Sequence, residues 1–119
     1  MTGRVKGLRE AVAVCLAKKA REVVILDMRK LSNFTEYFVI ASGDSTIQTR
    51  AIAEAIEERF KKKKFKLCHS EGRGEGRWIL LDAGHFVIHL FLKEVREFYN
   101  LELLWADAPR VKVNGKTAA

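Results

Sequence analysis

A short apolar segment followed at once by a long amphipathic helix constrains the fold of this chain most. Residues 37–42 (YFVIAS) have the character of a buried strand, and Gly43 ends it. Ser45 and Gln48 then show the three-residue spacing of a capping box, in which each side chain pairs with the other's backbone amide. The apolar positions of the helix that follows share one face: Ile47, Ala51, Ile52, Ala55, Ile56 and Phe60.

Other segments with a helical or strand pattern surround this unit, and Ala83-Gly84 marks a hairpin turn. The predicted elements are helices over residues 5–21 and 93–105 and strands over residues 23–28, 65–69, 78–82 and 86–92. Strands that alternate with helices in this order predict the α/β class, with a mixed sheet flanked by helices.

The chain of 119 residues is the size of one domain, and no linker or repeat interrupts it before Pro109. We therefore expect one domain over residues 1–108 and a basic, flexible tail over residues 109–119. No apolar run reaches the length of a membrane span, no secretion signal is evident, and two cysteines do not make a disulfide framework. A cytoplasmic protein with no membrane partner is the expectation.

The net charge of +7 comes from two local features. Residues 59–66 hold six basic residues and the last eleven residues hold three, with no acid in either; the remainder has 13 basic and 15 acidic residues. The first run either caps a solvated helix end or contacts RNA phosphates, with Phe60 and Phe65 available to stack on bases. The candidate RNA contacts are Arg59, Lys61, Lys62, Lys63, Lys64 and Lys66.

The sequence contains no recognisable catalytic constellation. No two acidic residues are separated by two positions, so the paired carboxylates of a two-metal site are missing. Cys68-His69 is one adjacent pair rather than a zinc motif, and no G-x-S-x-G turn is present. We predict no enzyme, metal or cofactor; a residual nucleotidyltransferase site built from distant acids is the alternative.

Aromatic residues gather in the last third of the chain: Trp78, Phe91, Phe98, Tyr99 and Trp105. They either fill the core or form a binding surface, since tryptophan and tyrosine are enriched among interface anchors.

Several segments together resemble the ribosomal silencing factor (Iojap) family. The match is collinear over residues 8–108. The segments that carry it are VILD at 24–27, TEYFVIASG at 35–43, WILLDAG at 78–84, VIHLF at 87–91, REFYNLE at 96–102 and LW at 104–105. The resemblance implies an α/β fold similar to nucleotidyltransferases but without their catalytic acids. It also implies binding to the large ribosomal subunit through its ribosomal protein number fourteen, steric blocking of subunit joining, and a homodimer when free.

The matching motifs supply candidate interface residues around the predicted hairpin and last helix. Alternation along the second strand of the hairpin places Val87, His89 and Phe91 on the same side of that strand. The candidate set is Trp78, Leu80, Asp82, His89, Phe91, Tyr99, Leu103 and Trp105, with Trp78 as the anchor. The lysine run, the tail beyond Ala108, and His85 in place of an acid depart from the family pattern.

Overall fold

The computed structural model describes residues 3–113, with side chains from residue 6 onward. In chain order the elements are α1 (Gly3–Ala17), β1 (Arg21–Asp27), β2 (Tyr37–Gly43), α2 (Thr46–Lys63), β3 (His69–Glu71), β4 (Trp78–Asp82), β5 (Phe86–Leu92), α3 (Lys93–Tyr99), α4 (Leu101–Leu104) and β6 (Arg110–Val111). The six strands form one mixed sheet in the order β3-β4-β5-β2-β1-β6. The predicted α/β class, a mixed sheet flanked by helices, is confirmed.

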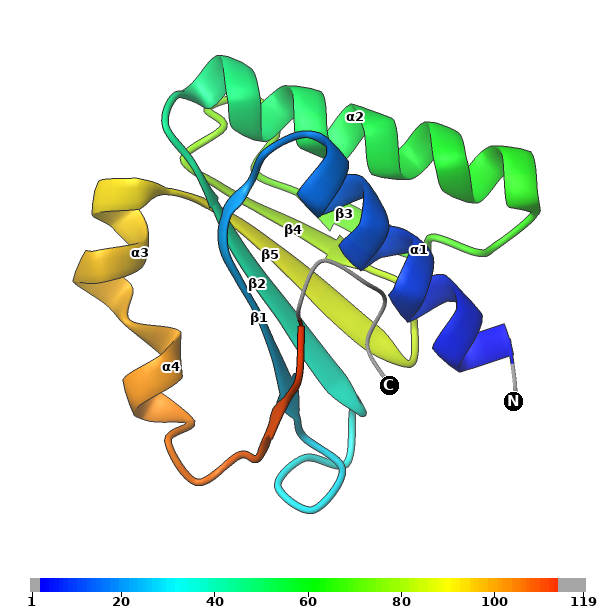
Figure 1. Ribbon diagram of the computed structural model, residues 1–119, viewed down its shortest axis with the longest axis vertical. Helices are drawn as coiled ribbons and strands as arrows, with labels where there is room; N and C mark the ends of the chain where they lie inside the picture. Colours follow the sequence, from blue (N-terminus) through cyan, green and yellow to red (C-terminus); the bar gives the residue numbers. More distant parts are fainter. Residues whose placement is uncertain (1–2, 114–119) are drawn as a thin grey trace.

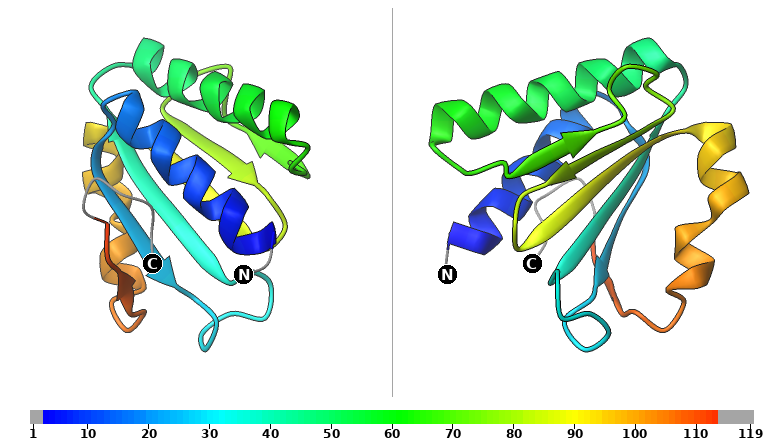
Figure 2. Two further views of the ribbon diagram at one scale, coloured as in Figure 1. Left: turned by 45° about the vertical axis from the view of Figure 1, so that its right-hand side comes forward. Right: turned by 180° about the vertical axis from the view of Figure 1, so that it is seen from behind.

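The helices divide between the two faces of the sheet (Figures 1 and 2). Helices α1 and α2 cover one face, and the short helices α3 and α4 lie on the other. β2 and β5 pair in parallel, while every other strand pair is antiparallel. Because a parallel pair needs a crossover, the chain between β2 and β5 passes through α2 and returns along the hairpin edge.

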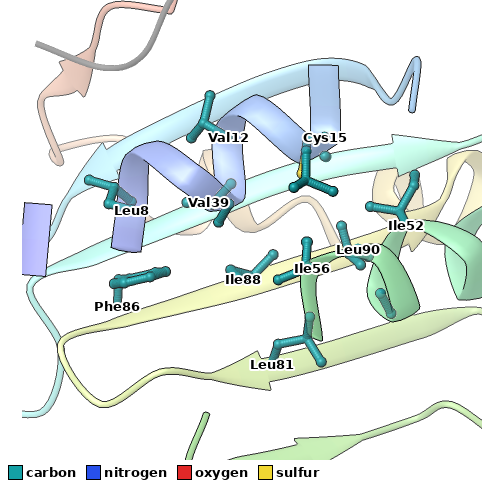
Figure 3. Close-up of a cluster of buried hydrophobic side chains, with 14 of the residues drawn as sticks. Leu8, Val12, Cys15, Val39, Ile52, Ile56, Leu81, Phe86, Ile88 and Leu90 are labelled. Atoms are coloured by element: carbon teal, nitrogen blue, oxygen red, sulfur yellow. The ribbon is translucent and has the colours of Figure 1, made fainter. Parts of the chain in front are cut away.

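The main core lies between the sheet and the two long helices (Figure 3). Ile88 and Leu90 of β5 point into it, opposite Ile52 and Ile56 of α2 and Cys15 of α1, and all five are at most 1% exposed. Alternate residues of the central strands face this layer, and the residues between them face α3 and α4. Strands β2, β4 and β5 are therefore buried or half buried throughout.

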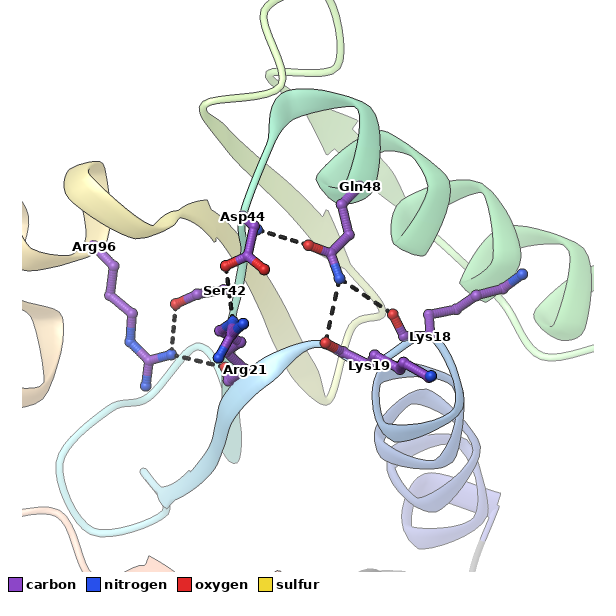
Figure 4. Close-up of polar contacts among 7 residues, drawn as sticks. All are labelled: Lys18, Lys19, Arg21, Ser42, Asp44, Gln48 and Arg96. Carbon is purple, nitrogen blue, oxygen red and sulfur yellow. Dashed lines mark hydrogen bonds and ion pairs between the residues drawn. The ribbon is translucent and has the colours of Figure 1, made fainter.

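Gln48 joins the start of α2 to the end of α1 (Figure 4). The Ser45 hydroxyl accepts a hydrogen bond from the Gln48 amide at 3.1 Å, which confirms the predicted cap. The Gln48 side chain does not return to Ser45: its Oε1 accepts from the Asp44 amide at 2.6 Å, and its Nε2 donates to the carbonyls of Lys18 and Lys19. The second half of the capping box therefore stabilises the neighbouring helix end.

The glycine-rich loop between β3 and β4 is held against α2. Arg50 donates to the carbonyls of Arg73 and Gly74, and the Thr49 hydroxyl donates to the Gly76 carbonyl at 2.6 Å. Gly72 has a φ of +86°, and a Cβ there would lie 1.9 Å from the Trp78 carbonyl oxygen. Only glycine fits this close approach, so the loop fixes the backbone at the start of β4.

Several predicted boundaries differ from the structure, and two of them fall where a residue other than glycine adopts a left-handed conformation. The first helix ends at Ala17 rather than residue 21, since Lys19 has a φ of 63°. Lys64 (φ 62°) ends α2, and the next strand covers His69–Glu71 rather than residues 65–69. The last helix breaks at Asn100 (φ 47°) into α3 and α4. Asparagine tolerates this conformation, but lysine rarely signals it.

Part of the expected flexible tail belongs to the sheet. Arg110–Val111 pair with β1, and the Pro109 carbonyl accepts a hydrogen bond from the Asp27 amide at 2.8 Å. The prediction was therefore wrong for this segment, and residues 114–119 lie outside the described residues.

Two isoleucines of α2 give a matched test of this layering. Ile56 is 0% exposed in the core, whereas Ile47 is 77% exposed on the same helix. We expect Ile56→Ala to lower the free energy of unfolding by about 2–5 kcal/mol, because it leaves a cavity. Ile47→Ala should change it by no more than about 0.5 kcal/mol. Urea unfolding of both variants measures the difference, and equal effects would contradict this arrangement of α2.

Candidate protein-interaction surface

The predicted interface residues of the hairpin share the sheet face opposite α1 and α2. Trp78, Leu80 and Asp82 alternate along β4, and the sheet register places Phe91 and His89 opposite the first two. The neighbouring Ile79 and Leu81 point the other way, into the main core. This face therefore belongs to the side on which only α3 and α4 lie (Figure 2).

Aromatic rings run in an unbroken chain across this face. The Trp78 ring lies 4.9 Å from Tyr99 and 4.7 Å from Phe91, measured between ring centroids, and Phe98 contacts Tyr99 at 5.1 Å. The rings of His89 and Phe38 continue toward Trp105 in edge-on contacts at 4.7 and 6.3 Å. Such offset and edge-on geometries are favourable for aromatic pairs, so the face is a packed and rigid surface.

A hydrogen bond fixes the indole of Trp78. Its Nε1 donates to Nδ1 of His89 at 3.1 Å, so the neutral imidazole carries its proton on Nε2. His89 is 5% exposed, and burial lowers the pKa of its imidazole to about 4. Its buried Nε2 has no hydrogen-bond partner in the described part of the chain. The ring is thus neutral at physiological pH and acts as the acceptor that orients Trp78.

Arg96 anchors α3 and α4 to the end of the sheet. Its guanidinium, 7% exposed, donates to both carboxylate oxygens of Glu102 at 2.9 and 3.0 Å. It also donates to the Ser42 hydroxyl at 2.8 Å and to the Arg21 carbonyl at 3.3 Å (Figure 4). The hydrogen bonds from Arg96 hold the pKa of the Glu102 carboxyl below its usual range. One side chain therefore joins α3, α4, β1 and β2.

The outer side of α3 and α4 exposes large apolar side chains. Phe98 is 81% exposed, Leu103 is 71% exposed and Leu104 is 69% exposed. Tyr99 is also exposed and adjoins Trp78, which is half buried. These side chains, with Leu80, form what we call the apolar panel: Trp78, Leu80, Phe98, Tyr99, Leu103 and Leu104. The predicted interface residue Asp82 lies outside it, because its carboxylate accepts a hydrogen bond from the Gly84 amide in the hairpin turn.

The structure divides the predicted interface residues into accessible and supporting ones. Phe91 is fully buried and His89 nearly so, so these two position Trp78 rather than face solvent. Trp105 is half buried against Phe38. Phe98 and Leu104 were missing from the predicted set, although Phe98 is one of the aromatic residues that the sequence singled out. Leu104 lies in α4, which the break at Asn100 separates from α3.

The basic run occupies the C-terminal end of α2 and the chain just after it. Phe60 is buried and is not free to stack on a base, whereas Phe65 packs on it with ring centroids 5.6 Å apart and is half buried. Arg59 donates to Glu10 of α1 at 2.6 Å, and this hydrogen bond lowers the pKa of the Glu10 carboxyl. The lysines at positions 61–64 and 66 are exposed.

Potential metal ligands do not gather within residues 3–113, where no three His, Cys, Asp or Glu side chains are placed to hold an ion. Burial raises the pKa of the Cys15 thiol to about 12, while Cys68 is exposed. Across the same residues, no helix combines the length and apolar character needed to cross a membrane.

The fold and the panel together define a small mixed α/β domain with a candidate docking surface. Residues 4–119 match the model of the family described as "ribosomal silencing factor during starvation". The chain is 41% identical over 102 residues to the ribosomal silencing factor of Bacillus subtilis, covering 86% of each chain. It therefore belongs to the ribosomal silencing factor family.

A solved structure and a more distant relative agree with this family. A crystal structure of a Bacillus halodurans protein superposes with a TM-score of 0.81 at 36% identity, covering 91% of this chain and 98% of that one. The mouse protein named "mitochondrial assembly of ribosomal large subunit protein 1" is 35% identical over 100 residues. That match covers 79% of this chain and 42% of the mouse protein.

The buried His89 predicts a loss of stability in mild acid. Its ordinary pKa is 6.5 and its folded pKa is about 4, so between these values the unfolded chain binds a proton that the folded chain excludes. The free energy of unfolding should fall as the pH drops from 6.5, by about 2 kcal/mol at pH 5. Urea unfolding at pH 7 and pH 5 measures it. His89→Gln, which keeps an acceptor for Trp78, should lose most of this slope; an unchanged slope would contradict the assignment.

The Arg96 network predicts a large effect of removing one ionic partner. Arg96→Met leaves the partly exposed Glu102 carboxylate without its main partner, and we expect unfolding to become easier by about 1–3 kcal/mol. The double variant Arg96→Met/Glu102→Met should recover part of this loss, because no buried charge then remains unpaired. Chemical unfolding of the pair measures the coupling, and strictly additive effects would contradict it.

Proposed function

We propose that this protein binds the large ribosomal subunit through the apolar panel, at ribosomal protein number fourteen, and thereby prevents the small subunit from joining. The observation that carries the proposal is the exposure of Phe98, Leu103 and Leu104 on α3 and α4, together with the ring contacts that lead from Phe98 through Tyr99 to the fixed indole of Trp78. A cluster of exposed apolar side chains around a rigid aromatic anchor is typical of a protein-binding surface.

Membership of the silencing factor family supports the ribosome as the partner. The name of the mouse relative connects that protein with the large ribosomal subunit, which agrees with the subunit chosen here. The partner protein itself follows from the family resemblance of the sequence, and the panel's composition fits a partner with an apolar contact area.

Blocking by this mechanism needs no catalysis. The domain measures 34 × 34 × 26 Å, so even its shortest dimension exceeds the separation of about 4 Å between atoms that touch across an interface. A domain of that thickness on the joining face keeps the two subunits apart wherever it is bound. Its effect then depends on its concentration relative to its dissociation constant and on competition with the small subunit.

In the absence of ribosomes, we propose that the same panel pairs two copies of the chain in the cytoplasm. A twofold interface brings the same patch of both subunits together, so exposed apolar side chains of one copy would be covered by those of the other. Binding to the large subunit would then replace the second copy of the chain as the partner that buries the panel.

Sedimentation of purified subunits with variants of the panel tests the proposal. Trp78→Ala should weaken binding to the large subunit by about 30-fold or more, as expected for a buried aromatic anchor. Leu103→Glu should abolish binding and shift the free chain from dimer to monomer, because it places a charge in the apolar contact. The measurement is the fraction of protein that co-migrates with the large subunit and the fraction of joined ribosomes.

Ile47→Glu is the matched control, because Ile47 is as exposed as Leu103 but lies at the start of α2. It should bind like the unmodified chain. Unimpaired blocking by Leu103→Glu, or equal loss with Ile47→Glu, would contradict the panel as the binding surface.

A further inference from the structure

The strongest concentration of positive charge lies at the end of the molecule remote from α3 and α4. Figures 1 and 2 show the C-terminal end of α2 and the start of α1 together on the side opposite these two helices. The lysines at positions 61–64 and 66 project from this end and are exposed. We call this region the basic end and define it as Lys61, Lys62, Lys64 and Lys66.

Four lysines at this end have no ionic partner within the described part of the chain, and they are the ones that define it. Glu10 accounts for two other cations, since it pairs with Arg59 at 2.6 Å and with Lys63 at 3.5 Å. The nearby acid Glu57 pairs instead with Arg73 of the glycine-rich loop. The basic end therefore carries charge beyond what the fold neutralises.

The end of a helix does not require so many cations. The dipole of α2 is equivalent to about half an elementary charge at its C-terminus, and Lys63 and Arg59 already lie there. Two of the unpaired lysines, Lys64 and Lys66, follow the last helical residue. Lys64 moreover adopts a left-handed conformation, with φ of 62°, which favours glycine.

The surroundings of the basic end determine which ligand chemistry suits it. Phe60 is buried and Phe65 is half buried against it, so the exposed groups of the run are its lysines. Lysine ammonium groups act as point charges rather than readers of base edges. A polyanion that is contacted through its backbone, without regard to sequence, fits this arrangement.

We propose that the basic end binds the phosphate backbone of RNA independently of base sequence. Because α3 and α4 lie on the opposite side of the molecule, a subunit contact made through these helices leaves the basic end free to contact ribosomal RNA. That second step rests on the proposed function, whereas the affinity for RNA itself does not.

The test compares two charge-matched variants of the full chain for binding to a fluorescent 20-base-pair RNA duplex of arbitrary sequence. One variant carries Lys61→Gln, Lys62→Gln, Lys64→Gln and Lys66→Gln. The control removes four exposed lysines elsewhere: Lys18→Gln, Lys19→Gln, Lys30→Gln and Lys93→Gln. Fluorescence anisotropy over a salt series gives the affinity and its dependence on ionic strength.

The unmodified chain and the control should bind with an affinity that falls steeply with salt. Loss of the basic end should weaken binding at least tenfold at low salt, and should flatten the slope of log affinity against log salt by about one for each phosphate contact removed. Changing the duplex sequence should leave the affinity unchanged.

Three results would overturn the proposal: equal RNA affinity of the two variants, a dependence on duplex sequence, or binding to anionic phospholipid vesicles but not to RNA. Leu103→Glu separates this proposal from the proposed function. That variant should keep its RNA affinity while it fails to bind the large subunit. If it retains subunit binding, the panel proposal fails and the basic end stands on its own measurement.

Discussion

The buried guanidinium of Arg96 is the contact on which the candidate surface depends. Helices α3 and α4 are only seven and four residues long, too short to be stable without tertiary support. Arg96 connects them through Glu102 and fastens both to the ends of β1 and β2. The Ser42 hydroxyl and the Arg21 carbonyl accept hydrogen bonds from Nη1 of Arg96. The guanidinium charge is therefore surrounded by polar partners at the edge of an apolar layer. Arg96 acts together with the packing of Tyr99 on Trp78 and of Val95 and Leu101 in the second apolar cluster, which also hold the two helices on the sheet.

The two faces of the sheet divide the tasks of stabilising the domain and of exposing apolar side chains to a binding partner. The face under α1 and α2 holds the main core and supplies most of the apolar burial. The opposite face has a smaller cluster around Phe91, Leu26 and Val95, and its cover leaves large apolar side chains in solvent. Stability comes chiefly from the first face, so the second can expose a rigid surface. His89 contributes to the rigidity of the second face. Burial keeps its imidazole neutral, so its Nδ1 accepts the hydrogen bond that orients the Trp78 indole.

Sequence patterns predicted the elements whose signals are local. The β4–β5 hairpin has alternating apolar residues around Ala83-Gly84, and α2 has a cap at Ser45, and both were confirmed. The lysine run correctly marked the end of α2, whereas the end of α1 before Lys19 was not predictable, because lysine there adopts a conformation that usually marks glycine. β6 was missed since it has only two residues and exists through pairing with β1.

The prediction of the candidate surface likewise succeeded where the sequence signal is local and failed where tertiary packing decides. Alternation along β4 and β5 correctly grouped Trp78 with His89 and Phe91, but pattern alone does not reveal which face a helix will cover. The predicted set omitted Phe98 of α3 and Leu104 of α4, which are exposed as Leu103 is, and it took α3 and α4 as one helix although Asn100 separates them. Asparagine is a known helix terminator, so that break had a signal that the apolar periodicity obscured.

Site-specific photo-crosslinking tests the central claim most directly. A photoreactive amino acid at position 103, and separately at position 47, would be activated in a mixture with purified large subunits. Both positions are exposed, but they belong to α4 and α2 respectively. The panel account predicts a crosslink from position 103 to a large-subunit protein, identified by mass spectrometry as ribosomal protein number fourteen, and none from position 47. Crosslinks from position 47 alone, or from neither position while the protein remains bound, would contradict it.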